Sequence, residues 1–222
     1  MAPLIEVSES VLKGLDQLSI PYELREENAT SEDNSDFIYV PSISLYVAKE
    51  RTHFEKNWYD AHRELQSKGN RMLTIPEFIE FLKYTRENNP EVYNDITEVR
   101  SPWRAEWIDA DFKIKNKKLY INSNHVLDSN GNLIPEDSKP LSRITLMKDS
   151  RISLEDWIKK NHTKQGFPTK KTKSGDLYYW YPKDDNNSVA RFYAYDVGSG
   201  FSCGRDPSGR SFSLGVRAVR KA

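Results

Sequence analysis

The C-terminal part of the chain, between Lys183 and Lys221, is rich in side chains suited to molecular recognition. Tyrosine offers a large, rigid, amphipathic contact at low cost in conformational entropy, and serine, glycine and aspartate adapt their hydrogen bonds to a partner. The same stretch contains no Lys, Glu, Gln, Met or Trp, although these types make up roughly one residue in five of the whole chain. The segment therefore predicts a binding surface of restricted composition.

The five missing residue types share a genetic property. None of them is reached from an asparagine codon, AAC or AAT, when only its adenines change, whereas Tyr, Ser, Asp, Gly, Phe, Arg, Val, Cys and His all are. The segment thus has the composition expected of asparagine codons rewritten at their adenines. A bare excess of Tyr, Ser and Gly is also typical of an ordinary β-rich loop region, and composition alone leaves that alternative open.

The other reactive side chains form no local catalytic or metal-binding motif. Cys203 is the only cysteine, which excludes an intrachain disulfide, and it has no identifiable base nearby. We therefore expect a protein that is not an enzyme and needs no cofactor. No histidine pairs with another at metal-ligand spacing, so no metal site is predicted: His53, His62, His125, His162. Two acidic pairs leave a structural cation open: Glu136-Asp137 and Asp184-Asp185.

Length and charge restrict the class of protein. At 222 residues the chain is long enough for one large domain or two small ones. Lysine plus arginine and aspartate plus glutamate both number 33, and this balance argues against a nucleic-acid partner. No apolar run is long enough for a membrane span, and no secretion signal is recognisable at the N-terminus. The localisation stays open between the cytoplasm and a virion or cell surface reached by an unrecognised route.

Two helices and several strands are expected to position the C-terminal segment, in an α+β order. A short strand-helix arm with an acidic linker is predicted for residues 1–36, and one domain for residues 37–222. Phe37–Val47 alternates as a strand. The first helix is predicted at Phe54–Ser67, which has one apolar stripe. The second opens with a capping box at Thr74–Glu77 and stops before Pro90.

After Pro102 the pattern changes to short strands and turns. The Asn130-Gly131 pair predicts a hairpin turn. Ser153 is a candidate N-cap for a short helix over 154–158. The expected strands are Ala105–Phe112, Lys118–Val126, Leu177–Tyr181 and Leu214–Val219.

The middle of the chain resembles the C-type lectin fold, including its formylglycine-generating-enzyme-like branch. Asn57–His62 and Gly69–Glu77 are similar to the helix, the G-x-R-L motif and the second-helix opening of that fold. Ser101-Pro102-Trp103 with Trp107 lies where that branch tends to carry aromatic turns. The resemblance implies two helices packed on short, irregular antiparallel strands.

The C-terminal segment resembles the variable region of proteins diversified by diversity-generating retroelements. In that family an adenine-directed reverse transcriptase rewrites asparagine-rich codons between fixed landmarks of the type A-R-F … C … P … L-G-V-R. This chain carries such landmarks in the same order: Ala190–Tyr195, Ser202–Ser208 and Ser213–Arg217. The status of Cys203 stays open, because cysteine is a landmark there and is also reachable from an asparagine codon.

The resemblance divides residues 178–213 and the landmarks that follow into two sets. Alternation along a strand predicts that the landmarks point inward and the residues between them outward, toward a ligand. The expected fixed residues are Ala190, Phe192, Ala194, Pro207, Leu214, Gly215, Val216 and Arg217. The expected variable, ligand-binding residues are Tyr193, Tyr195, Val197, Ser199, Ser202, Gly204, Asp206, Gly209, Ser211, Phe212 and Ser213.

The aromatic run Leu177–Tyr181 has two interpretations. It is either a ligand-facing shelf or a core strand, and Trp180 is expected to be fixed because tryptophan is not reachable by the adenine route. Tyr179, Tyr181 and Phe201 are further candidates for facing the ligand.

The resemblance implies a ligand-binding display protein, diversified by adenine-directed mutagenic retrohoming, with a macromolecular target that we expect to be a protein. Its locus is expected to carry a reverse transcriptase. One alternative is an adhesin or sugar-binding module of the same fold without diversification. Another is an enzyme of the formylglycine-generating branch. The E-P-N or Q-P-D loop and the W-N-D strand of calcium-dependent sugar sites are absent from the sequence.

Overall fold

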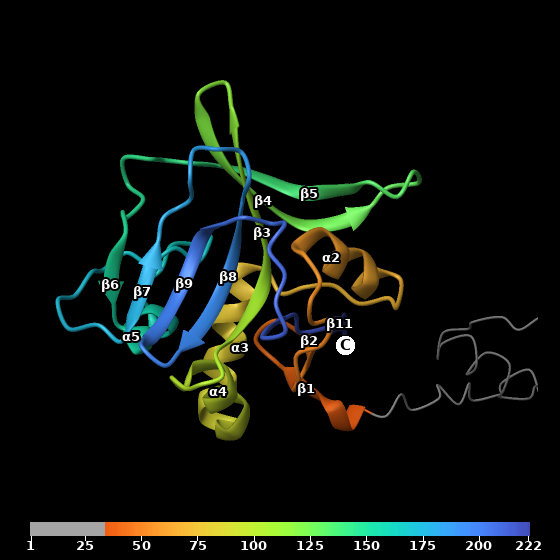
Figure 1. Ribbon diagram of the computed structural model, residues 1–222, viewed down its shortest axis with the longest axis horizontal. Coiled ribbons are helices and arrows are strands. Elements are labelled where there is room, and N and C mark those ends of the chain that lie inside the picture. Colours follow the sequence, from red (N-terminus) through yellow and green to blue (C-terminus); the bar gives the residue numbers. More distant parts are fainter. Residues whose placement is uncertain (1–33) are drawn as a thin grey trace, which may run out of the picture. The chain divides into compact units, whose positions relative to one another are not determined.

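The computed structural model describes residues 34–222, so the strand-helix arm expected before them lies outside the described residues. Residues 35–222 form one compact unit of mixed α and β structure in which strands predominate. The α+β class expected from the sequence is confirmed. Two sheets and the α-helices make up this unit (Figure 1).

The smaller sheet joins the start of the described residues to the end of the chain. Its order is β1-β2-β11, and both pairings are antiparallel. The single strand expected over 37–47 is instead a hairpin, because the chain turns at 41–44 with Ser44 at a φ of 53°. A short 3-10 helix, η1 (Asn34–Asp36), precedes the sheet, whose strands are β1 (Phe37–Val40), β2 (Leu45–Ala48) and β11 (Val219–Lys221).

The larger sheet has the order β5-β4-β3-β8-β9-β7-β6, and β10 pairs with β3 beside this path. Most neighbours are antiparallel as expected, but β7 pairs with β9 and β10 pairs with β3 in parallel. The strands are β3 (Arg104–Lys115), β4 (Lys118–Leu127), β5 (Leu133–Leu141), β6 (Ser150–Ile152), β7 (Leu177–Trp180), β8 (Ser188–Tyr195), β9 (Gly198–Arg205) and β10 (Leu214–Gly215). The expectation that the strands after Pro102 are short is wrong for β3 and β4, which have 12 and 10 residues and pair as one long hairpin.

The last strand expected from the sequence, over 214–219, is divided between the two sheets. Leu214 and Gly215 pair with β3 of the larger sheet, whereas Val219 begins β11 of the smaller one. Between them Val216 bridges Thr52. The chain leaves one sheet for the other at this point, so a single regular ladder cannot continue.

Three of the helices follow sequence signals, and one does not. Helix α2 (Trp58–Gln66) begins later than the predicted Phe54, because the Asn57 side chain caps it by accepting from the Asp60 amide. Helix α5 (Leu154–Lys159) begins at the expected N-cap Ser153, whose Oγ accepts from the Asp156 amide. In α3 (Ile75–Asn88) the Glu77 carboxylate accepts from both the amide and the hydroxyl of Thr74. The stop at Pro90 is real, but a further helix, α4 (Pro90–Thr97), starts there, because proline fits the first helical position.

Helices α3 and α5 cover one face of the larger sheet (Figure 1). Phe78 of α3 packs on Phe192 of β8, with ring centroids 5.5 Å apart, and Trp157 of α5 stacks on Phe201 of β9 at 4.7 Å. Because successive side chains of a strand point to opposite faces, the neighbours of Phe192 and Phe201 emerge on the uncovered face. That face is where the predicted variable residues must lie if they bind a ligand.

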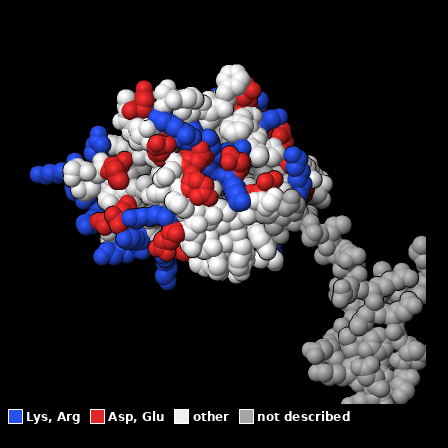
Figure 2. Space-filling view, turned by 90° about the horizontal axis from the view of Figure 1, so that it is seen from below, with Lys and Arg blue, Asp and Glu red and all other residues white. Residues whose placement is uncertain are grey.

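On the face of the molecule that Figure 2 shows, lysine and arginine side chains are interspersed with aspartate and glutamate. This mixture agrees with the zero formal net charge of the sequence. Within residues 34–222, no helix is long and apolar enough to cross a membrane.

Candidate ligand-binding surface

The expected fixed residues all lie inside the protein. Phe192, Leu214 and Val216 are 1 % exposed or less, and the other five are also buried. The prediction that the landmarks point inward is therefore confirmed. They are Ala190, Phe192, Ala194, Pro207, Leu214, Gly215, Val216 and Arg217.

Gly215 shows why one of these positions excludes a side chain. A Cβ placed on it would lie 2.9 Å from the Thr52 carbonyl oxygen and 2.9 Å from the Phe54 ring. The neighbouring residue Val216 exchanges backbone hydrogen bonds with Thr52, which holds the two segments this close. The glycine of the L-G-V-R landmark is thus fixed by a close approach of two backbones.

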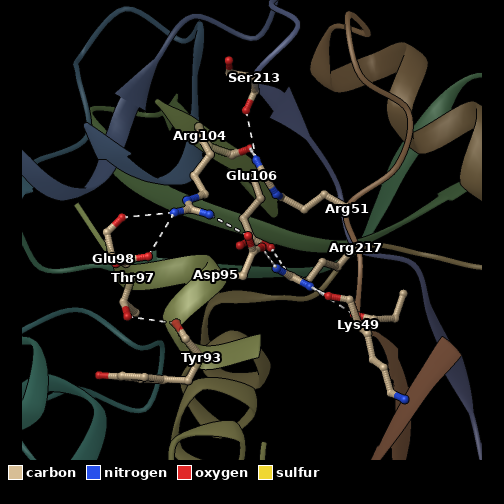
Figure 3. A network of polar contacts seen from close by, with 12 residues as sticks. Lys49, Arg51, Tyr93, Asp95, Thr97, Glu98, Arg104, Glu106, Ser213 and Arg217 are labelled. Carbon is tan, nitrogen blue, oxygen red and sulfur yellow. Dashed lines mark hydrogen bonds and ion pairs between the residues drawn. The ribbon is translucent and has the colours of Figure 1, made fainter. Parts of the chain in front are cut away.

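Arg217 is the centre of a buried network of charges (Figure 3). Its guanidinium contacts Glu106 Oε2 at 2.9 Å and Asp95 Oδ2 at 3.2 Å. It also donates to the carbonyl oxygens of Ala48 and Lys49. One side chain therefore ties the C-terminal landmark to β2, β3 and α4.

Two further arginines extend this network (Figure 3). Arg104 contacts Asp95 Oδ1 at 2.6 Å, while Arg51 donates to the carbonyl oxygens of Ala105 and Ser213. Burial lowers the pKa of Arg51. The network thus fixes both the start of β3 and the end of the segment that precedes Leu214.

The residues that alternate with the landmarks on β8 and β9 share the uncovered face of the sheet. On β8 these are Arg191, Tyr193 and Tyr195, which alternate with the inward residues Ala190, Phe192 and Ala194. The two-residue turn after Tyr195 pairs it with Gly198, so the outward residues of β9 have even numbers. Tyr193 therefore faces Gly200, and Arg191 faces Ser202.

Five aromatic side chains form a continuous row across this face, from β7 through β8 to the residue before β3. Tyr178 lies 4.6 Å from Trp180, and the Trp180 Nε1 donates to the Tyr193 hydroxyl at 2.7 Å. Tyr193 lies 4.7 Å from Tyr195, which meets Trp103 at 5.1 Å. We call Tyr178, Trp180, Tyr193, Tyr195 and Trp103 the aromatic row. Trp180, at 42 % exposed, presents its ring to solvent.

Gly200 makes room for the row. A Cβ at this position would lie 2.2 Å from the Tyr193 hydroxyl and ring, so a larger residue would displace the tyrosine. The position of Tyr193 on the sheet therefore depends on the glycine directly opposite it.

A hollow of about 490 Å³ opens beside the aromatic row. Five expected ligand-facing residues line it together: Tyr181, Tyr193, Tyr195, Ser202 and Gly204. We call this space the tyrosine hollow. Its other lining residues are Asp149, Trp180, Lys183, Arg191 and Arg205.

Arg191 gives the tyrosine hollow a buried positive charge. Its guanidinium lies over the Tyr193 ring, 4.9 Å from the centroid, and donates to the Tyr195 hydroxyl at 3.2 Å. Burial lowers its pKa. Among residues 34–222 no carboxylate pairs with Arg191, and its Nε has no hydrogen-bond partner. The hollow can therefore receive a hydrogen-bond acceptor or an anionic group.

Three of the expected ligand-facing residues point into the core instead. Tyr179 and Phe201 are fully buried and stack on each other at 5.9 Å. Ser199 is buried as well and donates to the Asp176 carbonyl oxygen. The predictions for these three residues are wrong, because the turn after Tyr195 places the odd-numbered residues of β9 on the helix-covered side. In β7 the same alternation makes Tyr179 core and Trp180 exposed.

The remaining candidates lie in the turns at either end of β9. Val197, at the tip of the β8–β9 turn, is 88 % exposed. Asp206 is exposed and accepts from the Ser208 amide, and Gly209 lies against the Arg205 guanidinium. They border the sheet without lining the tyrosine hollow.

Residues 206–213 cross to helix α2, where they line a second hollow, of about 560 Å³. Pro207 accepts from the Trp58 amide, and Arg210 forms an ion pair with Asp60. Ser211 and Phe212 line the second hollow with Glu55, Lys56 and Arg210, and Phe212 is 80 % exposed. Ser213 is held by its backbone, whose carbonyl accepts from Arg51 and Ala105.

Cys203 is fully buried on the helix-covered side of β9. Burial raises the pKa of its thiol well above the ordinary value. A thiol of this kind behaves as a small apolar core residue, because nucleophilic chemistry requires the accessible thiolate.

A second cluster of titratable residues lies away from the aromatic row, where α2 meets β3 and β4. His125 Nδ1 hydrogen-bonds to Asp109 Oδ1, and His125 Nε2 lies 3.5 Å from Asp111 Oδ1. His62 Nε2 lies 3.6 Å from Asp109 Oδ1. Burial opposes a charge on either histidine. It lowers the pKa of His62 to about 4, whereas the two aspartates outweigh it at His125 and raise that pKa to about 9.

One residue of each acidic pair considered as a cation site has another partner. Asp137 accepts from the Asn124 side chain at 2.8 Å, and Asp184 pairs with Arg143 at 3.1 Å. Within the described part of the chain neither pair joins a group of three possible metal ligands.

Sequence reasoning missed three parts of these sites. The position of Arg191 on the ligand-facing side could have been predicted, because it alternates along the strand in step with Tyr193 and Tyr195. Trp103 gave a weaker signal, because its contact with Tyr195 depends on the pairing of β3 with β8. No sequence signal indicated the association of His62 with His125, because the two residues are far apart in the chain and only the fold brings them together.

Comparisons of the chain with family models, curated proteins and solved structures find no match.

Proposed function

We propose that this chain is a ligand-binding display protein whose C-terminal surface is diversified by adenine-directed mutagenic retrohoming. Its variable positions would be the outward residues of β8 and β9 and the turns around them. The fixed positions would be the buried landmarks that hold this surface in place.

The observation that carries the proposal is the agreement between codon composition and strand face. The landmarks named from the sequence are all buried, while Tyr193, Tyr195, Ser202 and Gly204 line one hollow on the face opposite Phe192. Tyr193 and Ser202 are only 8 % and 7 % exposed, so strand phase rather than exposure distinguishes them from the landmarks. A surface of this kind can change without disturbing the core, because landmark and variable side chains lie on opposite sides of the same strands.

The tyrosine hollow suits a protein ligand that presents an acidic or amide-bearing side chain. Arg191 supplies a partly desolvated guanidinium that pairs with no carboxylate among residues 34–222, and planar guanidinium groups bind carboxylates with two parallel hydrogen bonds. The aromatic row around it supplies rigid apolar area of the type enriched at binding hot spots.

The fold that we propose for residues 37–222 is a C-type lectin fold of the formylglycine-generating-enzyme-like branch. Two observations support it: α2 and α3 follow each other where the resemblance placed them, and the β3–β8 and β8–β9 ladders are irregular, each with a shift of register. An undiversified sugar-binding module of this fold is the second candidate, since the exposed ring of Trp180 could stack on a sugar. A glycan-array signal that survives exchange of Tyr195 and Phe212 would favour that candidate.

Simultaneous exchange of four variable positions is expected to preserve the fold. The variant combines Tyr195→Asn, Val197→Asp, Asp206→Ser and Phe212→Asn, all reachable from asparagine codons. Surface changes typically cost within about 0.5 kcal/mol each, so the sum stays near 2 kcal/mol or below. For a chain of this size Tm should then fall by less than about 8 °C, as measured by circular dichroism.

The control exchanges three landmarks on the same strand: Ala190→Asn, Phe192→Asn and Ala194→Asn. These changes bury unsatisfied amides and are expected to abolish cooperative unfolding. Equal losses of Tm in both variants would show that the division into fixed and variable positions is wrong.

A further inference from the structure

His62, Asp109 and His125 bring three potential metal-ligand atoms together inside the protein. These atoms lie within 4.8 Å of one another, and all three residues are buried. They come from separate elements, His62 from α2, Asp109 from β3 and His125 from β4. Two imidazoles and one carboxylate suit a borderline transition metal such as zinc, whereas magnesium and calcium prefer oxygen ligands alone.

His62 lacks the hydrogen bonds that a buried histidine ordinarily makes. It is fully buried, and neither of its ring nitrogens has a hydrogen-bond partner. Buried polar groups in native proteins nearly always have partners, so each exception calls for a specific cause. Its Nε2 points toward Asp109 Oδ1 at 3.6 Å, a distance too long for a hydrogen bond.

One of the three separations already fits a metal ion. Zinc binds imidazole nitrogen at about 2.0–2.1 Å, which places tetrahedral ligand atoms roughly 3.3 Å apart. The separation of His62 Nε2 from Asp109 Oδ1 is close to that value. His125 Nδ1 now hydrogen-bonds to the same carboxylate oxygen and would retreat slightly to admit the ion.

The surroundings of the three residues resemble the outer shell of metal sites. A ligating histidine usually directs its other ring nitrogen to a carboxylate, and Asp111 Oδ1 lies 3.5 Å from His125 Nε2. The second oxygen of Asp109 accepts from the His125 amide at 3.1 Å, which fixes the carboxylate. The Trp58 ring covers both imidazoles, with centroids 4.2 Å from His62 and 5.0 Å from His125.

Two hollows of the surface reach residues of the cluster. Asp109 lines one hollow, of about 250 Å³, and His125 lines another, of about 600 Å³. Asn124 borders both hollows, so the cluster lies close behind the surface between them.

We propose that His62, Asp109 and His125 bind one divalent transition-metal ion, with zinc as the first choice, and that Asp111 orients His125 from behind. The ion would pin α2 to strands β3 and β4. This site is separate from the tyrosine hollow and does not depend on the variable surface.

The test measures zinc binding by the full chain and by His62→Phe. Phenylalanine keeps an aromatic ring against Trp58 and removes the ligand. After chelator treatment and dialysis against limiting zinc, elemental analysis should find about one zinc ion per wild-type chain. Because removing even an outer-shell partner costs about 10–100-fold in affinity, His62→Phe should bind zinc more than about 100-fold more weakly, and Asp111→Asn about 10–100-fold more weakly.

His53→Ala is the matched control, because His53 lies outside the cluster, next to Glu64, and should retain wild-type affinity. Cobalt-loaded wild-type protein and cobalt-loaded His53→Ala should have the same visible absorption spectrum, and Asp111→Asn should change it. If His62→Phe does not fold, this spectrum replaces the affinity of that variant as the test. Zinc should raise Tm of the wild-type chain at concentrations where magnesium does not. Wild-type protein that retains no zinc, or His62→Phe that binds it equally, overturns the proposal.

Discussion

Replacing Arg217 with methionine is expected to lower the free energy of unfolding by about 3–5 kcal/mol. The side chain is 1 % exposed and contacts both Glu106 and Asp95. Glu106 is buried too, so removal of the guanidinium leaves a carboxylate in the interior without this partner. Urea denaturation of the full chain, followed by circular dichroism, measures the loss.

Arg210→Met is the matched control for this prediction. Arg210 also forms an ion pair, with Asp60, but its side chain is more than half exposed, and exposed pairs contribute about 0–1 kcal/mol. Adding Glu106→Gln to Arg217→Met should recover part of the loss, since it removes the uncompensated charge. If Arg217→Met costs no more than Arg210→Met, the buried network does not hold the C-terminal landmark in place.

Phe201→Ala is expected to cost about 3–5 kcal/mol of stability, whereas Phe212→Ala should stay within about 0.5 kcal/mol. Both phenylalanines lie in the segment of restricted composition, and both are reachable from asparagine codons. Phe201 is fully buried and stacks on Trp157, while Phe212 is 80 % exposed. The pair therefore separates burial from residue type, and chemical denaturation of the two variants measures it.

The burial of Phe201 limits which diversified chains are stable. If adenine-directed changes reach position 201, most of the resulting chains should be unstable, so functional variants should retain an apolar residue there. Equal stability of Phe201→Ala and Phe212→Ala would contradict the assignment of strand faces in β9.

The sequence predicted local structure well wherever a few adjacent residues determine it. The capping box of Thr74 and Glu77 and the N-cap at Ser153 are examples, because their hydrogen bonds close within one helical turn. Helix α4 was missed because Pro90 was interpreted only as a stop. Proline also fits the first position of a new helix, and the sequence rule does not distinguish these two roles.

Predictions that depended on pairing between strands succeeded only in part. Alternation placed Phe192 and Tyr193 on their correct faces, because both lie within one strand. It failed for Ser199 and Phe201, since the phase of β9 depends on the length of the turn after Tyr195. The prediction of one strand over 214–219 was wrong for a related reason, because the chain passes from one sheet to the other at Val216.

The spacing of residues along the sequence does not predict the histidine cluster. Its members come from a helix and two strands, and their contacts follow from the packing of α2 against β3 and β4. Within the cluster only the alternation of Asp109 and Asp111 along one strand was visible in the sequence. The fold, rather than a motif, decides which of these side chains meet.

The most direct test of the central claim is the DNA sequence around the coding region. The account predicts a nearby near-copy of the segment that encodes Ala190–Arg217, beside a gene for a reverse transcriptase. The copy should differ from the coding sequence only at positions where it carries adenine, and these should fall mainly in the codons of outward residues such as Tyr193, Tyr195 and Phe212. Differences spread over all four template bases, or concentrated in the codons of buried landmarks, would contradict it.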